Sequence, residues 1–270
     1  MIKLTNQKLT ISGHIIEYDF MDQPIKYGSN PNRKPPSPRT GKPTTPEKDR
    51  LETSINRAKA NVRRLVNSNA HKWIKPDGKS YMPIFITLTF KDDVRDLKYA
   101  SDCFKTAIQR LNYFVSGGSK KHILHYIAIT EFQDKNRDGV IHYHVLFFNL
   151  PFIKKIYDEI KRIWRHGNVN VKSVRRVKNL GYYMVKYMSK NLTDGRLKGR
   201  KKYFSSKGLK KPQVLYDPNL INLVVDLMPS KCNTGSFSWD NFYCGKITRT
   251  TYDVKDDKSA LAWLYALVLK

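Results

Sequence analysis

Cysteine is scarce in this chain. Only Cys103, Cys232 and Cys244 occur among 270 residues, and no two of them form a Cys-x-x-Cys pair. An odd number of cysteines without paired spacing argues against a secreted scaffold held by disulfide bonds. We therefore expect free thiols and a location in the cytoplasm of a host cell.

Long apolar runs and nucleotide-binding loops are absent as well. The apolar segment 260–269 is too short to cross a bilayer, and no secretory signal peptide is expected. We expect no membrane partner. No Gly-x-x-x-x-Gly-Lys-[Ser/Thr] segment occurs, so the chain should lack a helicase motor of its own.

Acidic residues are few relative to basic ones. The chain has 23 Asp+Glu against 50 Lys+Arg, a net charge of +27 and a pI near 9.9. A chain this basic binds polyanions; DNA is the first expectation, and RNA or an anionic membrane surface are alternatives.

The positive charge is concentrated in residues 196–211, which contain eight basic residues and no acidic one. Tyr203 and Phe204 interrupt this run, so a base could stack there while the cations follow the phosphates. The alternatives are a solvated loop or a localisation signal. Our DNA-binding candidates from this run and the preceding helix are Lys190, Arg200, Lys201, Lys202, Tyr203 and Lys207.

Two histidines flank one residue in the apolar run 141–148, Ile-His-Tyr-His-Val-Leu-Phe-Phe. Such a run predicts a buried strand, and side chains alternate along a strand, so His142 and His144 share one face. Their Cα atoms would lie about 7 Å apart, close enough for both imidazoles to bind one metal ion. The alternative is two ordinary histidines on a sheet face.

A helix is predicted for residues 180–192. Tyr183, Lys186, Tyr187 and Lys190 fall on one of its faces, and the apolar stripe of Leu180, Met184, Met188 and Leu192 falls on a neighbouring face. Tyrosine is a weak nucleophile near its ordinary pKa of about 10, and nearby cations favour the phenolate. The alternative is a basic amphipathic helix without chemistry.

Three blocks in this order resemble the HUH endonucleases, in particular the rolling-circle replication initiators of small phages and plasmids. The first is Phe-Ile-Thr-Leu-Thr-Phe at 85–90, and the second is Glu-Phe-Gln at 131–133 with Gly-Val-Ile-His-Tyr-His at 139–144. The third is Tyr-x-x-Lys-Tyr-x-x-Lys at 183–190. The resemblance runs from about residue 50 to 212.

The resemblance implies a metal site and a nucleophile. His142, His144 and Glu131 would hold Mg²⁺ or Mn²⁺, with Glu131 across the hairpin from His142. Tyr183 or Tyr187, assisted by Lys186, would attack single-stranded DNA at a replication origin and form a 5′-phosphotyrosine link. A separate helicase, expected from the host, and a polymerase would be partners. The connection 134–138 is longer than is usual in this family.

Two other classes of protein remain open. A transposase or relaxase of the same superfamily would share the chemistry, although relaxases often carry their nucleophile near the N-terminus. A basic nucleic-acid-binding protein without catalysis would bind DNA with a steep salt dependence and cleave nothing.

The expected fold class is α+β. Strands are predicted at about 83–90, 122–131, 140–149 and 168–174, with helices from about 96 and at about 152–165. This order is ferredoxin-like, an antiparallel sheet with helices on one face and an open active-site face.

Three regions are predicted along the chain. Residues 1–48 comprise a hairpin that turns at Ser12-Gly13 and a basic, proline-rich linker, and a helix is expected to start at Thr45-Pro46-Glu47. Residues 49–212 form the endonuclease domain, and residues 213–270 form a C-terminal extension of unknown role.

Overall fold

The computed structural model describes residues 2–28, 47–189, 196, 201 and 203–267. The chain forms two compact units. The central unit spans Thr45–Lys210, and the terminal unit combines Met1–Thr44 with Lys211–Lys270. The proline-rich linker predicted at 31–46 lies outside the described residues.

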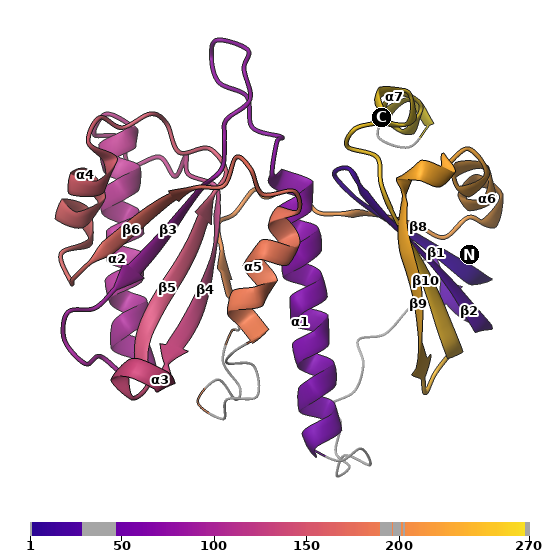
Figure 1. Ribbon diagram of the computed structural model, residues 1–270, viewed down its shortest axis with the longest axis horizontal. Helices are drawn as coiled ribbons and strands as arrows, with labels where there is room; N and C mark the ends of the chain where they lie inside the picture. The colour runs from indigo at the N-terminus through magenta and orange to yellow at the C-terminus, as the bar shows by residue number, and fades with distance from the viewer. Residues whose placement is uncertain (1, 29–46, 190–195, 197–200, 202, 268–270) are drawn as a thin grey trace. The chain divides into compact units, whose positions relative to one another are not determined.

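The central unit is built on a five-stranded antiparallel sheet (Figure 1). The order of its strands is β6-β3-β5-β4-β7. Their bounds are β3 (Ile84–Thr89), β4 (Tyr126–Gln133), β5 (Val140–Phe147), β6 (Val169–Ser173) and β7 (Tyr203–Ser205). Helix α2 (Leu97–Val115) follows β3, and helix α4 (Ile156–Trp164) follows β5. The α+β class and the ferredoxin-like order of elements are therefore confirmed.

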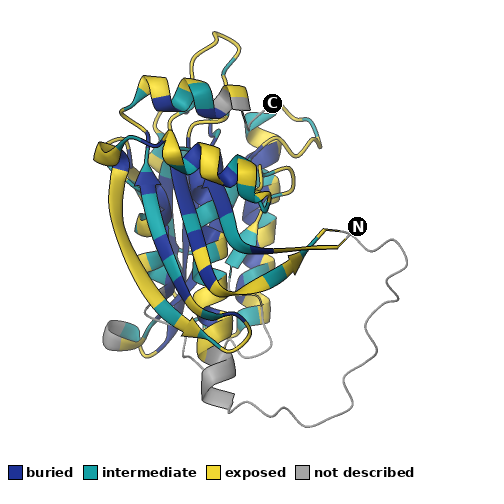
Figure 2. Cartoon of the chain, turned by 90° about the vertical axis from the view of Figure 1, so that its right-hand side faces the viewer, coloured by how far each residue is buried: buried dark blue, intermediate teal, exposed yellow. Residues whose placement is uncertain are grey.

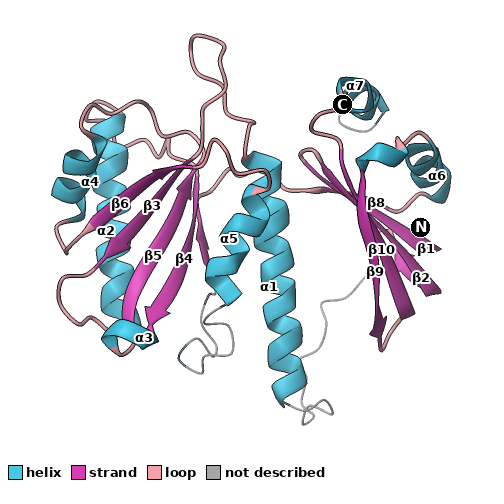
Figure 3. Cartoon of the chain, in the orientation of Figure 1, coloured by secondary structure: helices cyan, strands magenta, loops and turns pink. Residues whose placement is uncertain are grey.

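Helices lie on both sides of this sheet (Figure 3). On one side, Tyr143 and Val145 of β5 pack with α2 and α4. On the other side, Leu146 of β5 and Phe85 of β3 pack with α1 (Glu47–Asn69) and α5 (Leu180–Ser189). Every residue of β5 is buried, as a strand with packed layers on both faces requires. The face expected to be open thus carries two helices over these apolar positions.

Element boundaries differ from the prediction at two places. Strand β4 begins at Tyr126 rather than near residue 122, and α4 begins at Ile156 rather than near residue 152. Phe152 is 94% exposed, and Lys155 before the helix has a left-handed φ of 51°. Both segments contain apolar residues that periodicity alone assigns to the neighbouring element. The predicted start of α2 is confirmed, because the Asp96 side chain accepts the Tyr99 N–H.

The terminal unit forms a second five-stranded antiparallel sheet, in the order β8-β1-β2-β10-β9. Its strands are β1 (Lys3–Ser12), β2 (Ile15–Tyr27), β8 (Gln213–Leu215), β9 (Asn233–Asn241) and β10 (Gly245–Asp253). The hairpin turn at Ser12-Gly13 is as predicted, and Gly13 supplies the required positive φ of 64°. Figure 2 shows the buried central strands of this sheet in dark blue and the exposed edge strand β9 in yellow.

Two helices cover one apolar face of the terminal sheet. Helix α6 (Pro218–Asp226) and helix α7 (Lys258–Leu267) contribute Ile221, Val224 and Leu264 to a core shared with Leu9 and Ile11 of β1. The sequence analysis anticipated α7 but not α6, whose apolar residues resemble a strand. Among the described residues, no helix combines the length and apolar character needed to cross a membrane.

The terminal unit also buries a network of charges. The Arg249 guanidinium donates to Asp19 Oδ2 at 2.8 Å and to Glu17 Oε1 at 3.0 Å. Lys8 Nζ lies 2.8 Å from the same Asp19 oxygen. Burial alone would raise the pKa of Asp19, but the hydrogen bond from Arg249 and the charges of Lys8 and Arg249 hold it below its ordinary value.

Candidate active site

The strand register places four polar side chains next to one another on the central sheet. His142 is paired with Glu131 on β4 and with Thr89 on β3. His144 is paired with Thr87 on β3. The position of Glu131 across from His142 agrees with the hairpin prediction. Because Glu131, His142 and His144 are all less than 10% exposed, their polar atoms must find partners inside the protein or a ligand.

His144 is held at both ring nitrogens. Its Nε2 contacts Glu131 Oε2 in a short hydrogen bond, and its Nδ1 lies 3.1 Å from Thr87 Oγ1. Since a carboxylate only accepts, Nε2–H donates to Glu131 and Nδ1 accepts from the Thr87 hydroxyl. Thr87 belongs to the 85–90 block, but the sequence analysis gave it no role.

His142 has the opposite character. Within the part of the chain that the structure describes, its buried Nε2 has no hydrogen-bond partner. Burial lowers the pKa of His142 to about 4; the charges of His144 and Arg137 act in the same direction and Glu131 opposes them. His142 is therefore a neutral imidazole at physiological pH, the form that binds metal ions.

The donor set of two imidazoles and one carboxylate suits a divalent ion, and the unpartnered His142 nitrogen fits such a ligand. As the side chains stand, however, no three His, Cys, Asp or Glu residues in the described ranges are arranged to hold a metal ion. The hydrogen bond between Glu131 and His144 occupies two of the three donors. It would have to open for both residues to bind one ion.

Close contact between two helices sets the position of α5. The Gly181 N–H donates to Asn67 Oδ1 of α1 at 3.0 Å. A Cβ at Gly181 would lie only 2.6 Å from the Arg63 carbonyl oxygen, so α1 excludes any side chain there. The predicted apolar stripe is confirmed at Leu180, Met184 and Met188, which are buried, whereas Leu192 lies outside the described residues.

This docking brings both predicted tyrosines to the histidines. The Tyr187 ring lies 4.2 Å from the His144 ring, centre to centre, and 5.1 Å from the Phe85 ring. The Tyr187 hydroxyl donates to the Tyr183 hydroxyl at 3.1 Å. Tyr182, expected to lie off this face, is 54% exposed, with the Arg63 guanidinium 5.1 Å from its ring centre.

Lys186 lies close to both rings, with Nζ 5.0 Å from the Tyr183 centre and 5.5 Å from the Tyr187 centre. The pKa of Tyr187 is nevertheless raised, by burial first, then by its hydrogen bond and electrostatic interaction with Tyr183 and by the charge of Glu131. The expectation that nearby cations favour the phenolate therefore does not hold for Tyr187 in this structure. Its phenol is protonated, and ionising it requires further positive charge close to its oxygen.

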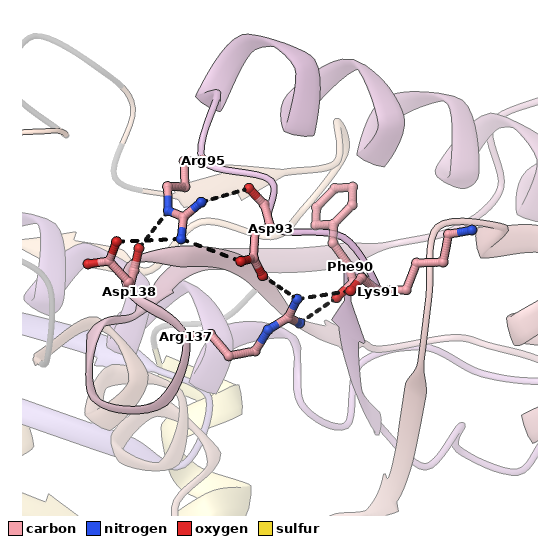
Figure 4. A network of polar contacts seen from close by, with 6 residues as sticks. All are labelled: Phe90, Lys91, Asp93, Arg95, Arg137 and Asp138. Carbon is pink, nitrogen blue, oxygen red and sulfur yellow. Dashed lines mark hydrogen bonds and ion pairs between the residues drawn. The ribbon is translucent and has the colours of Figure 1, made fainter.

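The long connection between β4 and β5 is firmly held (Figure 4). It forms the short helix α3 (Asp134–Arg137), and Asp138 after it has a left-handed φ of 44°. Arg137 donates to the Phe90 carbonyl oxygen at 2.7 Å, and Arg95 Nε donates to the Asp138 carbonyl oxygen at 2.7 Å. These bonds tie the hairpin to the chain after β3, beside the strand ends that carry Glu131 and His142.

The structure describes only part of the predicted DNA-binding set. Lys190, Arg200 and Lys202 lie outside the described residues. Lys201 and Tyr203 line a groove of about 450 Å³ together with residues of α1, including Arg57. Lys207 is exposed.

Phe204, which the sequence analysis offered for base stacking, is instead engaged by the protein. It is a residue of β7 and packs on the α2 side of the sheet, with its ring 5.7 Å from the Phe104 ring. The predicted stacking platform in this run is therefore left with Tyr203, which is half-buried in the groove.

With this geometry established, comparison with known proteins points to replication. Residues 83–192 match a family model described as a replication-associated protein of the ORF2 type. The matched stretch extends from β3 to α5, so it contains Glu131, both histidines and both tyrosines. Similarity to this replication-associated family supports a role in replication initiation and an interaction with DNA. Comparisons with curated proteins and with solved structures yield no match.

Proposed function

We propose that this chain is a rolling-circle replication initiator that nicks and rejoins single-stranded DNA at an origin through a tyrosine. The observation that carries the proposal is the contact between Tyr187 and His144, whose ring centres are 4.2 Å apart. These residues belong to motifs more than forty positions apart in the sequence. A merely structural tyrosine-rich helix gives no reason for its two tyrosines to meet the buried His-x-His pair.

Tyr187 is the proposed first nucleophile because it is the tyrosine stacked on His144. Its oxygen attacks the scissile phosphorus, forming an O–P bond while the bond to the 3′ oxygen breaks. The phenol proton leaves through the Tyr183 hydroxyl, which accepts its hydrogen bond, and passes to solvent; the departing 3′ oxygen takes up a proton. The products are a 5′-phosphotyrosine and a free 3′-hydroxyl, and rejoining is the reverse reaction.

The buried polar cluster is the proposed site of Mg²⁺ or Mn²⁺, with His142, His144 and Glu131 as ligands. The unpartnered Nε2 of neutral His142 supports this assignment. A bound divalent ion would polarise and orient the scissile phosphate, and its charge would favour the phenolate. Thr87 keeps the His144 ring oriented through Nδ1.

The positive charge of the chain is the proposed source of DNA affinity. Lys186, exposed beside both tyrosine rings, would contact the phosphate next to the scissile bond. Lys201, Tyr203 and Lys207, with the undescribed Lys190, Arg200 and Lys202, would hold the flanking strand. Helicase and polymerase activities would come from separate proteins.

Covalent trapping tests the proposal directly. Purified protein is mixed with labelled single-stranded DNA from its own replicon and Mn²⁺, then resolved on a denaturing gel. A metal-dependent adduct is expected, absent with EDTA and in the Tyr183→Phe/Tyr187→Phe double variant. Tyr187→Phe alone should lower adduct formation more than Tyr183→Phe alone.

Tyr182→Phe is the matched control, because this residue lies on the same helix but off the active face. It should form the adduct as the unaltered protein does. Tight, salt-sensitive binding of an origin-containing DNA without any adduct would instead identify a non-catalytic DNA-binding protein.

A further inference from the structure

A second cationic cleft lies on the side of the central sheet opposite the histidines. It has a volume of about 800 Å³ and is lined by the C-terminal half of α2, the segment after it and the end of α4. These helices cover the sheet face that carries Tyr143 rather than the histidines (Figure 3). Its volume is typical of sites that bind small molecules or single nucleotides.

The side chains around this cleft are cationic and aromatic. No Asp or Glu among the described residues lines it. Tyr113 is 57% exposed and Phe114 is 40% exposed, so large aromatic surface faces solvent beside the charges. The basic lining residues are Arg110, Lys120, His122, Arg162 and Arg165.

Arg110 is the residue that most needs a ligand. Its Nη1 is buried and has no hydrogen-bond partner within the described chain. A guanidinium N–H buried without an acceptor is unfavourable by about 1–3 kcal/mol or more. The charge of Arg110, together with burial, lowers the pKa of His166, so no nearby carboxylate cancels that charge.

Arg162 shows how a flat group can be held at this cleft. Its guanidinium donates to Glu159 Oε2 at 3.0 Å and 2.7 Å, and its central carbon lies 5.7 Å from the Phe114 ring centre. Arg162 is thus held in place, and one partner of Phe114 is already a planar cation. Arg110, Lys120 and Arg165 remain to bind an anion.

We propose that this cleft binds a nucleotide unit, in which Arg110 and Arg165 contact a phosphate and Tyr113 or Phe114 stacks on the base. The unit comes either from a DNA strand, separate from the strand at the histidines, or from a free nucleotide. The combination of guanidinium groups with exposed rings favours a phosphate attached to an aromatic base over inorganic phosphate or an acidic peptide.

Binding, not cleavage, tests this inference. The Arg110→Gln/Arg165→Gln double variant and the unaltered protein are titrated with dAMP, deoxyadenosine, inorganic phosphate and a fluorescent six-nucleotide dA strand. Loss of two charge-assisted contacts should weaken the binding of dAMP, of the strand or of both at least about tenfold. Phe114→Ala should weaken the same probes, and deoxyadenosine and inorganic phosphate should bind poorly to every protein.

Lys98→Gln is the matched control, since it removes a positive charge from an exposed position of α2 that does not line the cleft. A loss confined to the dA strand would identify a strand segment as the occupant, and a loss that includes dAMP would identify a nucleotide-sized ligand. Equal affinities of the double variant and Lys98→Gln for both probes, with matching thermal unfolding, would overturn the inference.

The result is separable from the proposed nicking activity. Adduct formation does not enter the measurement, and the same titrations on Tyr183→Phe/Tyr187→Phe protein should give unaltered affinities. If trapping fails while the cleft variants lose nucleotide, the proposed chemistry is wrong and the cleft stands.

Discussion

The two units of this chain bury charged or titratable groups in five-stranded antiparallel sheets, but they treat these groups differently. In the terminal unit, Arg249 is bonded to both Asp19 and Glu17. In the central unit, His142 Nε2 has no partner among the described residues, and Tyr187 has a raised pKa. The first arrangement is complete as it stands, whereas the second gains from adding a cation. Incomplete pairing at a buried site is characteristic of function rather than of stability.

The largest expected effect comes from breaking the completed network. Arg249→Met leaves Asp19 and Glu17 buried without their main partner, and we expect a loss of about 3–5 kcal/mol in the free energy of unfolding of the terminal unit. Denaturant unfolding measures the change. Lys246→Met, at an exposed position of the same strand, should cost less than about 0.5 kcal/mol. Comparable losses in the two variants would remove the basis of the contrast.

His142→Ala tests the other half of the comparison. Because His142 Nε2 has no partner to lose, we expect a stability cost of only about 1–2 kcal/mol, mostly from lost packing. Adduct formation should fall at least about a hundredfold, since a proposed metal ligand is removed. DNA affinity should be largely kept, because it resides in the distributed basic surface. A folded His142→Ala protein that has lost DNA binding would contradict this division of roles.

The smallest expected effect is an acid dependence of the terminal unit. The pKa of Asp19 is lower in the folded chain than its ordinary value of 3.8. Its contribution to stability is therefore fully present above about pH 5 and is lost as the pH falls through the folded pKa. Thermal unfolding between pH 6 and pH 2 should show this loss. In Asp19→Asn protein, already less stable at pH 6, that part of the decline should be missing.

Strong local patterns predicted the central unit well. Each of its four main strands and both crossover helices lie close to the predicted positions, and the Asp96 cap is confirmed. The weaker predictions concern segments where apolar residues continue past the end of an element. Phe152 is one example, since it is apolar yet almost fully exposed before α4. Local periodicity does not register the left-handed turn at Lys155 that delays the helix.

The terminal unit was the least predictable part. The hairpin of β1 and β2 was visible at Ser12-Gly13, but its pairing with β8 and β10 joins residues more than two hundred positions apart. Nothing in the local pattern of either end indicates the other. Likewise, α6 was missed because its apolar residues suit a strand as well as a short helix until Ile221 and Val224 meet β1.

By itself, the sequence determined which side chains share a face. The two-residue period of a strand puts His142 beside His144, and the period of a helix puts Tyr183 beside Tyr187. Only the tertiary structure decided that Tyr187 is the tyrosine that stacks on His144, that Glu131 bonds to His144 and that Arg110 is left unpaired at a cleft. The physical reason is that periodicity acts within one element, whereas these contacts depend on how closely separate elements approach. At Gly181, that approach leaves no room for even a single methyl group.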